Sequence, residues 1–496
     1  MRAILIIHVS LILLSSVLGQ NKPILKGKIK EYVAQPINLY QCYGDSLYWI
    51  DSVSTNKSGE FEITSIKPKK RNNIQQSMYK IVLQNDQFFF IVLDNEQIEM
   101  ETYYTTSSMY NTLIDSLLIT KSQSNKHFYQ FQNLQMSLNI ANQWLLQMMR
   151  LFPLQDSFHP TIEQEYLDRY KAMDDFVKTK IKSIDADNNY FKIQHMDAGT
   201  KVALAYYIPV NPDWKQPDSW RDSIIAAHYF DYFNPADKFY LHSNILPEKI
   251  DIYLNLTSNR SDNTGKPFNN EHLLLNAAKS FIEQTNENDE TYRFCLNYIL
   301  KRFNQEYKYT ALMKLYDNYL NVPEGECGEQ EQDEFSWVRR KVNILRGVQV
   351  GSTAPDFKLP DQSFLSAEQS DYVLLLFWAS WCPHCMTALP EIKNIVDDFS
   401  QRLKKVGATF RVITISLDNS KVEWENAINK HDIKNWINFS EFKGWKGEIS
   451  QLYNVYATPT IFLLDKEKKI IATLERTNQL KEALETELAT RIVSEE

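Results

Sequence analysis

The chain has 496 residues, more than one ordinary domain contains, and its length favours about three domains. Hydrophobic residues make up 43% of the chain and aromatic residues 13%, which excludes a disordered protein. The formal net charge of −8 argues against a nucleic acid or an anionic membrane as the main partner.

Residues 1–19 have the features of a secretory signal peptide. Arg2 gives a positive start, residues 3–18 are almost wholly apolar, and Val17 and Gly19 fit the positions before a cut at Gln20. The alternative is an uncleaved anchor, but this apolar run is short for a spanning helix. We expect a mature protein outside the cytosol, without membrane insertion.

Alternating apolar residues separated by turn-forming residues indicate a β-rich domain over residues 20–108. The pattern predicts a small antiparallel sandwich or barrel. It contains no catalytic constellation, so we interpret it as an interaction or scaffold module. The predicted strands cover residues 25–29, 37–41, 61–63, 79–83 and 88–93.

A helical period then predicts a mostly helical middle domain over residues 109–346. Apolar faces are expected from Leu113 through Leu117 and Leu118, over residues 134–148 and over residues 166–181. Their Met and aromatic residues are interpreted as core.

Strands and helices alternate over residues 347–496, which predicts an α/β domain with a central sheet covered on both faces. The predicted strands are residues 357–359, 372–377, 409–417, 460–464 and 469–474. One predicted helix begins after Cys382, and three more cover residues 422–430, 446–453 and 479–491.

The five cysteines include one Cys-x-x-Cys pair, Cys382 and Cys385, which follows the predicted buried strand and begins an amphipathic helix. Unpaired amides and the peptide dipoles at a helix start stabilise a thiolate, and the thiolate is the form that attacks disulfides. The placement therefore predicts a redox-active disulfide. Cys295 and Cys327 could form a structural disulfide, with Cys42 buried and inert.

Other uses of a Cys-x-x-Cys pair fit the sequence less well. A structural zinc site needs a second pair of ligands at suitable spacing, which the chain lacks, and haem attachment needs His where Met386 stands. A plain structural disulfide does not explain the strand–helix junction. Peroxide reduction needs Thr or Ser three residues before the cysteine and a Pro before that, but Ala379 and Leu375 occupy these positions. We predict no metal and no cofactor.

Several spaced motifs together resemble thioredoxin. They are the Phe-Trp-Ala-Ser-Trp-Cys-x-x-Cys of residues 377–385, Pro390, and the Ala-Thr-Pro-Thr-Ile-Phe of residues 457–462. Gly351 to Phe357 and Gly444-Trp445 extend the resemblance to the TlpA/ResA-type extracytoplasmic thiol–disulfide oxidoreductases. It covers about residues 348–496, and it implies a thioredoxin fold and the periplasm of a bacterial envelope, with secretion as the second choice.

The resemblance assigns a role to each matching residue. Cys382 is expected to be the exposed nucleophile and Cys385 the less exposed thiol that resolves the mixed disulfide. Trp381 is expected to shield the pair. Pro459 corresponds to the family's cis-proline facing the disulfide, and Thr458 offers backbone groups to a substrate strand.

Pro383 and His384 between the cysteines bear on the direction of electron flow. An imidazole there favours the Cys382 thiolate and makes the disulfide more oxidising. The same Cys-Pro-His-Cys occurs in the strong oxidant DsbA. The alternative is that His384 is merely an exposed surface residue, so the direction stays open.

Two acids of related proteins are missing. TlpA/ResA proteins usually carry Glu at the position of Ala388, and thioredoxin carries a buried Asp at the position of Leu376. Both acids are thought to handle the proton of the buried cysteine. Glu391 lies past Pro390 and is not expected to replace them.

The sequence thus predicts a thiol–disulfide oxidoreductase that exchanges its dithiol with cysteines of client proteins and uses a membrane or soluble redox donor. The alternative is an envelope binding or scaffold protein that keeps a redox-inactive thioredoxin-like domain.

Overall fold

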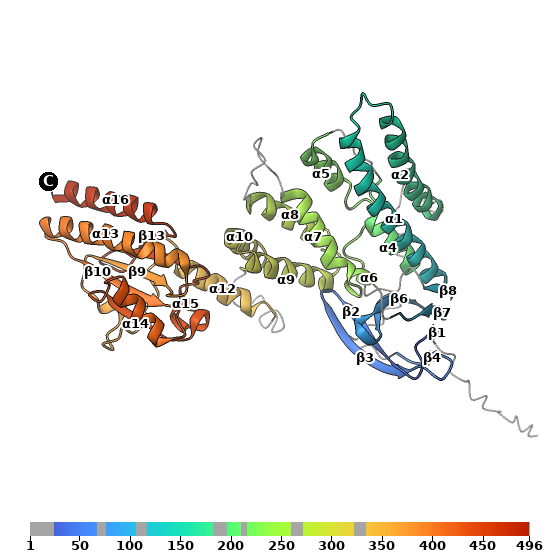
Figure 1. Cartoon of the computed structure of the whole chain (residues 1–496), viewed down its shortest axis with the longest axis horizontal. Helices are drawn as coiled ribbons and strands as arrows, with labels where there is room; N and C mark the ends of the chain where they lie inside the picture. Colours follow the sequence, from blue (N-terminus) through green and yellow to red (C-terminus); the bar gives the residue numbers. More distant parts are fainter. Residues whose placement is uncertain are drawn as a thin grey trace, which may run out of the picture. The chain divides into compact units, whose positions relative to one another are not determined.

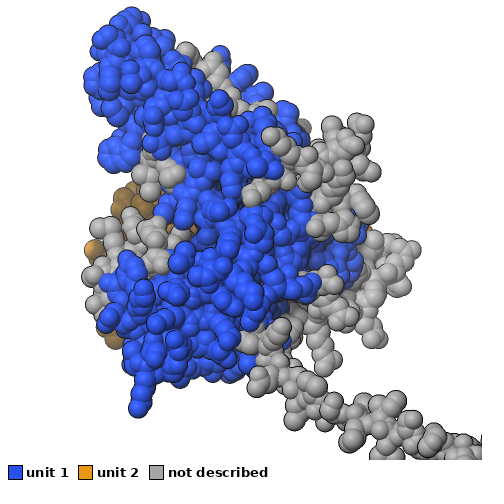
Figure 2. Space-filling view, turned by 90° about the vertical axis from the view of Figure 1, so that its right-hand side faces the viewer, with its two compact units in different colours: residues 1–311 blue, residues 312–496 orange. Residues whose placement is uncertain are grey.

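The computed structural model describes residues 24–66, 76–105, 117–181, 196–209, 216–258, 271–321 and 334–495. The predicted signal peptide and Cys327 lie outside these residues, so the proposed Cys295–Cys327 disulfide stays a prediction. The chain divides into two compact units, residues 1–311 and residues 312–496 (Figure 2). The predicted boundary at residue 347 falls inside the second unit.

Two four-stranded sheets form the β-rich part of the first unit, with strand orders β4-β1-β7-β8 and β3-β2-β5-β6. Alternating burial along β1 and β4 shows that one face of each packs inward, which the period of two predicts. The strands are β1 (Leu25–Lys30), β2 (Pro36–Tyr43), β3 (Ser46–Ser54), β4 (Glu60–Ile63), β5 (Gln76–Val82), β6 (Phe88–Asp94), β7 (Ile98–Tyr103) and β8 (Leu118–Lys121).

Two expectations for this region are corrected. The predicted antiparallel pairing holds for β1 with β4, β2 with β3, β2 with β5, β5 with β6 and β7 with β8, but β1 and β7 pair in parallel, with Leu25 opposite Ile98. Strands β2 to β6 separate these two along the chain, so no tight hairpin imposes antiparallel pairing. The helical interpretation of Leu118 is also wrong. This residue begins β8 and pairs with Glu101 of β7, a long-range contact that a short apolar run cannot reveal.

The remainder of the first unit is helical, as the period of 3.6 predicts. Polar side chains cap several helix starts: Ser122, Asp197 and Asn288 each accept a backbone N–H three residues on. The helices are α1 (Gln123–Leu151), α2 (His159–Ile181), α4 (Ala198–Tyr206), α5 (Asp218–Ala227), α6 (Lys238–Leu241), α7 (Ile245–Ser258), α8 (Glu271–Glu283) and α9 (Asp289–Gln305), followed by α10 (Tyr309–Tyr319), which crosses the division between the units.

Helix α1 joins the helical part to the sheets. Near its start, the buried side chain of Asn125 donates to the carbonyl of Val92 in β6 and accepts the Val92 N–H, at 2.7 and 2.8 Å. Farther along, α1 lies beside α2 (Figure 1), and Met149 packs with Ile162 and Tyr166. The β-rich and helical parts of the first unit therefore share packed surfaces.

A buried lysine lies in the middle of the helical part. Lys249 in α7 is 2% exposed, and its Nζ lies 3.9 Å from the ring centroid of Tyr229 and 5.2 Å from that of Phe233. Burial lowers the pKa of Lys249 to about 7, although neighbouring Glu248 acts in the opposite direction. The unfolded chain therefore binds more protons than the folded one between about pH 7 and the ordinary lysine pKa.

Replacing this lysine, as Lys249→Met, is expected to stabilise the protein by a few kcal/mol at pH 6, since one pKa unit corresponds to about 1.4 kcal/mol. Folding stability contributed by this site rises with pH above 7, so the advantage of the methionine variant shrinks as the pH approaches 9.5. Urea unfolding across this range measures it, with exposed Lys301→Met as the control. An advantage of Lys249→Met that is constant with pH contradicts the assignment.

The second unit contains a five-stranded sheet of order β11-β10-β9-β12-β13. Strands β9, β10 and β11 are parallel, whereas β12 runs antiparallel to both β9 and β13. The strands are β9 (Tyr372–Trp378), β10 (Phe410–Ser416), β11 (Ile437–Ser440), β12 (Thr460–Leu464) and β13 (Ile470–Leu474).

Helices cover both faces of this sheet, as predicted: α13 and α16 lie on one side, and α14 and α15 on the other (Figure 1). Every residue of the central strand β9 is buried, which explains its continuous apolar sequence. The helices of this unit are α12 (Ser336–Gly347), α13 (Pro383–Lys405), α14 (Lys421–Lys430), α15 (Glu448–Leu452) and α16 (Thr477–Glu495).

Two strand predictions in this unit are corrected. Residues 357–359 form no ladder strand and make only an isolated bridge between Lys358 and Phe364. Strand β11 was missed because it is a short edge strand of four partly exposed residues, so its sequence lacks an apolar run. None of the helices in the described part of the chain is both long and apolar enough to cross a membrane.

Candidate active site

The Cys-x-x-Cys pair lies where β9 passes into α13. Cys382 is the residue that caps this helix, and its sulfur accepts the backbone N–H of Cys385 at 3.2 Å. Pro383 occupies the first turn, where a missing N–H costs nothing and a fixed φ suits the helix. The helix start therefore directs an unpaired amide at the sulfur of Cys382, which favours negative charge there.

The two sulfurs are close together and both thiols are free, with the Cys385 thiol donating to the Cys382 sulfur at 2.7 Å. Cys382 is 6% exposed and Cys385 is 1% exposed. Cys382 is thus less exposed than the resemblance leads us to expect. Its thiol also lies 3.4 Å from the backbone carbonyl of Thr458, to which it donates, and this neighbouring loop accounts for part of the cover.

The loop opposite the dithiol contains the Thr458–Pro459 peptide bond, which is cis. It leads directly into β12, which pairs with β9, so the two strands bring residues 76 positions apart into contact. Thr458 therefore lies beside Cys382, and Pro459 follows it in the same loop.

The two thiols differ in their surroundings. Burial, together with the hydrogen bond to Cys382, raises the pKa of the Cys385 thiol to about 12. Cys385 therefore stays protonated at neutral pH and serves as a donor to its partner. This asymmetry suits Cys382 as the attacking sulfur and Cys385 as the one that must lose a proton later.

The remaining residues singled out in the sequence surround the pair on the exposed side. Pro383 and His384 are exposed. Trp381 is 48% exposed, and its ring meets the edge of Trp445 with centroids 6.1 Å apart. An aromatic surface thus adjoins Cys382 in the chain. Trp445 contributes to it from the short helical turn that precedes α15.

The structure also contains a buried acid near the site that the sequence analysis missed. Leu376 and Ala388 have apolar side chains, so neither position supplies a carboxylate; Leu376 is fully buried and Ala388 partly buried. Asp418, two residues beyond β10, is fully buried, and its carboxylate accepts hydrogen bonds from Ser380. Parallel strands end at the same sheet edge, so an acid following the strand next to β9 could have been sought there.

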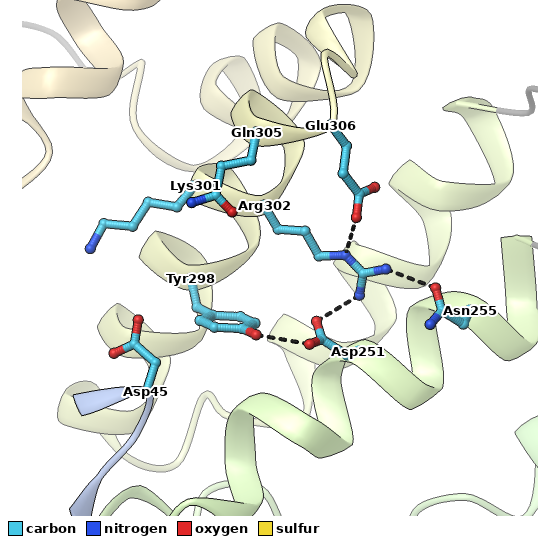
Figure 3. A pocket seen from close by; sticks show the side chains of 8 residues that line it. All are labelled: Asp45, Asp251, Asn255, Tyr298, Lys301, Arg302, Gln305 and Glu306. Atoms are coloured by element: carbon cyan, nitrogen blue, oxygen red, sulfur yellow. Dashed lines mark hydrogen bonds and ion pairs between the residues drawn. The ribbon is translucent and has the colours of Figure 1, made fainter. Parts of the chain in front are cut away.

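A cavity of about 270 Å³ lies in the first unit between α7 and α9 (Figure 3). At its centre Arg302 donates to Asp251, Asn255 and Glu306. Because the guanidinium already binds these side chains, we interpret its hydrogen bonds as a link between α7 and α9 and assign the cavity no ligand. The residues that line it are Asp45, Asp251, Asn255, Tyr298, Lys301, Arg302, Gln305 and Glu306.

Among the residues described in both units, no group of three or more His, Cys, Asp or Glu side chains is arranged to hold a metal ion.

A dithiol at the start of a helix, next to the central strand of a mixed sheet and against a cis Thr–Pro bond, defines a redox domain of the thioredoxin fold. Residues 369–470 match the family model described as thioredoxin-like. Through this region the chain belongs to the thioredoxin-like family, and it is a thiol–disulfide oxidoreductase.

Individual relatives agree with this assignment. The thioredoxin-like protein YneN of Bacillus subtilis is 30% identical over 146 residues, which are 29% of this chain and 80% of YneN. The thiol-disulfide oxidoreductase ResA of Bacillus thuringiensis subsp. konkukian is 28% identical over 142 residues, which are 28% of this chain and 76% of ResA.

Two similar solved structures come from Bacteroides species. A thiol-disulfide oxidoreductase from Bacteroides fragilis is 34% identical, with 26% of this chain and 98% of that chain covered and a TM-score of 0.23. A thioredoxin-like protein from Bacteroides caccae is 21% identical, with 56% of this chain and 98% of that chain covered and a TM-score of 0.32.

The raised pKa of Cys385 predicts slow alkylation. In a Cys382→Ala variant, iodoacetamide at pH 8 should modify Cys385 more than about a hundredfold more slowly than a free cysteine peptide, since burial keeps the thiol protonated. Mass spectrometry of the peptides separates Cys385 from the other cysteines, and urea should restore ordinary reactivity. Rapid labelling of Cys385 in the folded variant contradicts the prediction.

Proposed function

We propose that the protein exchanges its Cys382–Cys385 dithiol with cysteines of client proteins outside the cytosol. The observation that supports this most directly is the Cys382 sulfur at the N-terminus of α13, where it receives the Cys385 N–H and faces Thr458. This arrangement favours a thiolate and leaves a backbone strand beside it for a client segment.

In the reducing direction the chemistry runs in two steps. The Cys382 thiolate attacks one sulfur of a client disulfide, a bond forms between Cys382 and the client, and the other client sulfur leaves as a thiolate. Cys385 then loses its proton and attacks Cys382, which closes the Cys382–Cys385 disulfide and releases the second client thiolate. The client gains two electrons and the dithiol loses two; oxidation of a client is the reverse.

The residues between the cysteines support an oxidising direction. His384 places an imidazole within the motif, next to Cys385 and two residues after Cys382, and a donor or positive charge there favours the reduced form of the pair. A pair with a stabilised reduced form takes electrons more readily. We therefore propose that this disulfide is more oxidising than that of thioredoxin.

The predicted signal peptide at residues 1–19 supports a periplasmic location, with secretion as the second choice. In either place the dithiol needs a partner that resets it, which we propose to be a membrane or soluble redox protein. The alternative of a scaffold with an inert thioredoxin-like domain is not favoured, because two free thiols lie 2.7 Å apart at a helix start.

The central test is the Cys382→Ser variant. Purified wild-type protein should reduce insulin with a thiol donor or oxidise a reduced peptide, and Cys382→Ser should lose this turnover because serine cannot form the mixed disulfide. The matched control is Cys42→Ala, which removes a buried thiol in β2. Turnover that survives in Cys382→Ser refutes the proposed exchange.

The direction of electron flow is tested by measuring the reduction potential of the Cys382–Cys385 pair. Titration with glutathione buffers should give a reduction potential above the value of about −270 mV known for thioredoxin. His384→Ala should lower it, because the imidazole no longer favours the reduced form. A wild-type value at or below that of thioredoxin, or one that His384→Ala leaves unchanged, argues against the role given to His384.

A further inference from the structure

We propose that Asp418 is a positioning residue for the redox pair: its buried carboxylate holds the turn that presents Cys382 at the start of α13. The inference rests on the exchange reaction proposed for Cys382. It concerns how the attacking sulfur is kept in place, and it assigns Asp418 no contact with the client.

The carboxylate of Asp418 is fully buried and accepts three kinds of hydrogen bond. The backbone N–H of Ser380 donates to its two oxygens at 3.0 and 3.2 Å, and the Ser380 hydroxyl donates to one of them. The Ser416 hydroxyl donates to the other oxygen, while the Asp418 N–H donates to the Ser416 oxygen. A buried carboxylate is stable only with such partners.

These bonds hold the chain as it leaves β9. The last paired residues of the two strands are Trp378 and Ser416, and the Leu417 N–H donates to the Trp378 carbonyl at 2.8 Å. Asp418 then accepts the hydrogen bonds from Ser380, and the Cys382 N–H donates to the Ala379 carbonyl at 3.2 Å, which completes the turn. The turn is thus fixed two residues before the attacking cysteine.

The position of Cys382 depends on this turn because its sulfur must lie within reach of one backbone amide. The bond from the Cys385 N–H to the Cys382 sulfur is close for a hydrogen bond to sulfur, at 3.2 Å, so it depends on an exact placement of Cys382. A turn that is free to shift weakens this bond and with it the preference for a thiolate. Loss of the Asp418 carboxylate should therefore act on Cys382 through Ser380.

The position of Asp418 also separates it from the acids found in related proteins. Those acids occupy the places of Leu376 in β9 and Ala388 in α13, within the elements that carry the cysteines. Asp418 belongs to the chain that follows β10, and its hydrogen bonds given above go to Ser380 and Ser416. Its geometry fits a group that fixes the backbone of the turn.

The test compares Asp418→Ala, Asp418→Asn and Ser380→Ala in the full-length chain, with Asp371→Ala as the matched control. Asp371 accepts the N–H and hydroxyl of Thr409 in a similar way, but it precedes β9 at the opposite end of the strand. The measurements are the rate of iodoacetamide labelling at Cys382, the dithiol–disulfide ratio in a fixed glutathione buffer, and the urea midpoint.

In Asp418→Ala, labelling of Cys382 at pH 7 should slow by about tenfold and the ratio should move toward the disulfide by a similar factor, which corresponds to about 1.4 kcal/mol lost from the bond between the Cys385 N–H and the thiolate. Asp418→Asn and Ser380→Ala keep part of the network, so each should show a smaller change in the same direction. The double variant Asp418→Ala with Ser380→Ala should match Asp418→Ala alone. Asp371→Ala should change only the urea midpoint.

Two outcomes overturn the proposal. If labelling and the glutathione ratio are unchanged while stability falls, Asp418 serves folding only. If labelling becomes faster and Asp418→Asn equals Asp418→Ala, its negative charge acts on the sulfur directly. Should Asp418→Ala not fold, Ser380→Ala decides by the same criteria. Labelling of Cys382 needs no client, so it tests the inference even if the wild type fails to turn over insulin.

Discussion

The redox site depends on one hydrogen bond, from the backbone N–H of Cys385 to the sulfur of Cys382. The bond exists because α13 begins directly after Cys382, so that one of the first amides, which has no carbonyl partner within the helix, points at the sulfur. Everything around it serves to keep this start in place: β9 is buried along its whole length, and α13 packs its apolar face on the sheet. The backbone thus supplies the chemistry, and side chains adjust it.

The same arrangement explains why the two cysteines behave differently. Cys385 lies within the first turn and is shielded by the domain core, so its thiol keeps its proton and donates to Cys382. Cys382 lies at the boundary, between the helix start and the carbonyl of Thr458. In the proposed exchange, a client strand that pairs with Thr458 would compete for this carbonyl and so uncover the sulfur.

Asp418, Lys249 and Arg302 show how neighbouring groups determine the stability of a charge that has little contact with solvent. Asp418 is surrounded by hydroxyl and amide donors, whereas Lys249 faces aromatic rings that stabilise its charge only in part. Arg302 lines a cavity and donates hydrogen bonds to Asp251 and Asn255 of α7 and to Glu306. The carboxylate of Asp418 has hydrogen-bond partners for its charge, whereas burial lowers the pKa of Lys249 to about 7.

By itself the sequence determined most of the elements and the cysteine pair, since both depend on local pattern. The apolar run of β9, the helical spacing after Cys382 and the Thr458-Pro459 motif can be recognised without knowledge of the fold. Only the tertiary structure decided which strands pair, because pairing joins segments far apart in the chain. Examples are β1 with β7, β8 with β7, and the short edge strand β11 with β10. It also decided the partner of Ser380. Asp418 lies 38 residues away and looks like an ordinary loop acid until the parallel register of β9 and β10 brings the ends of both strands together.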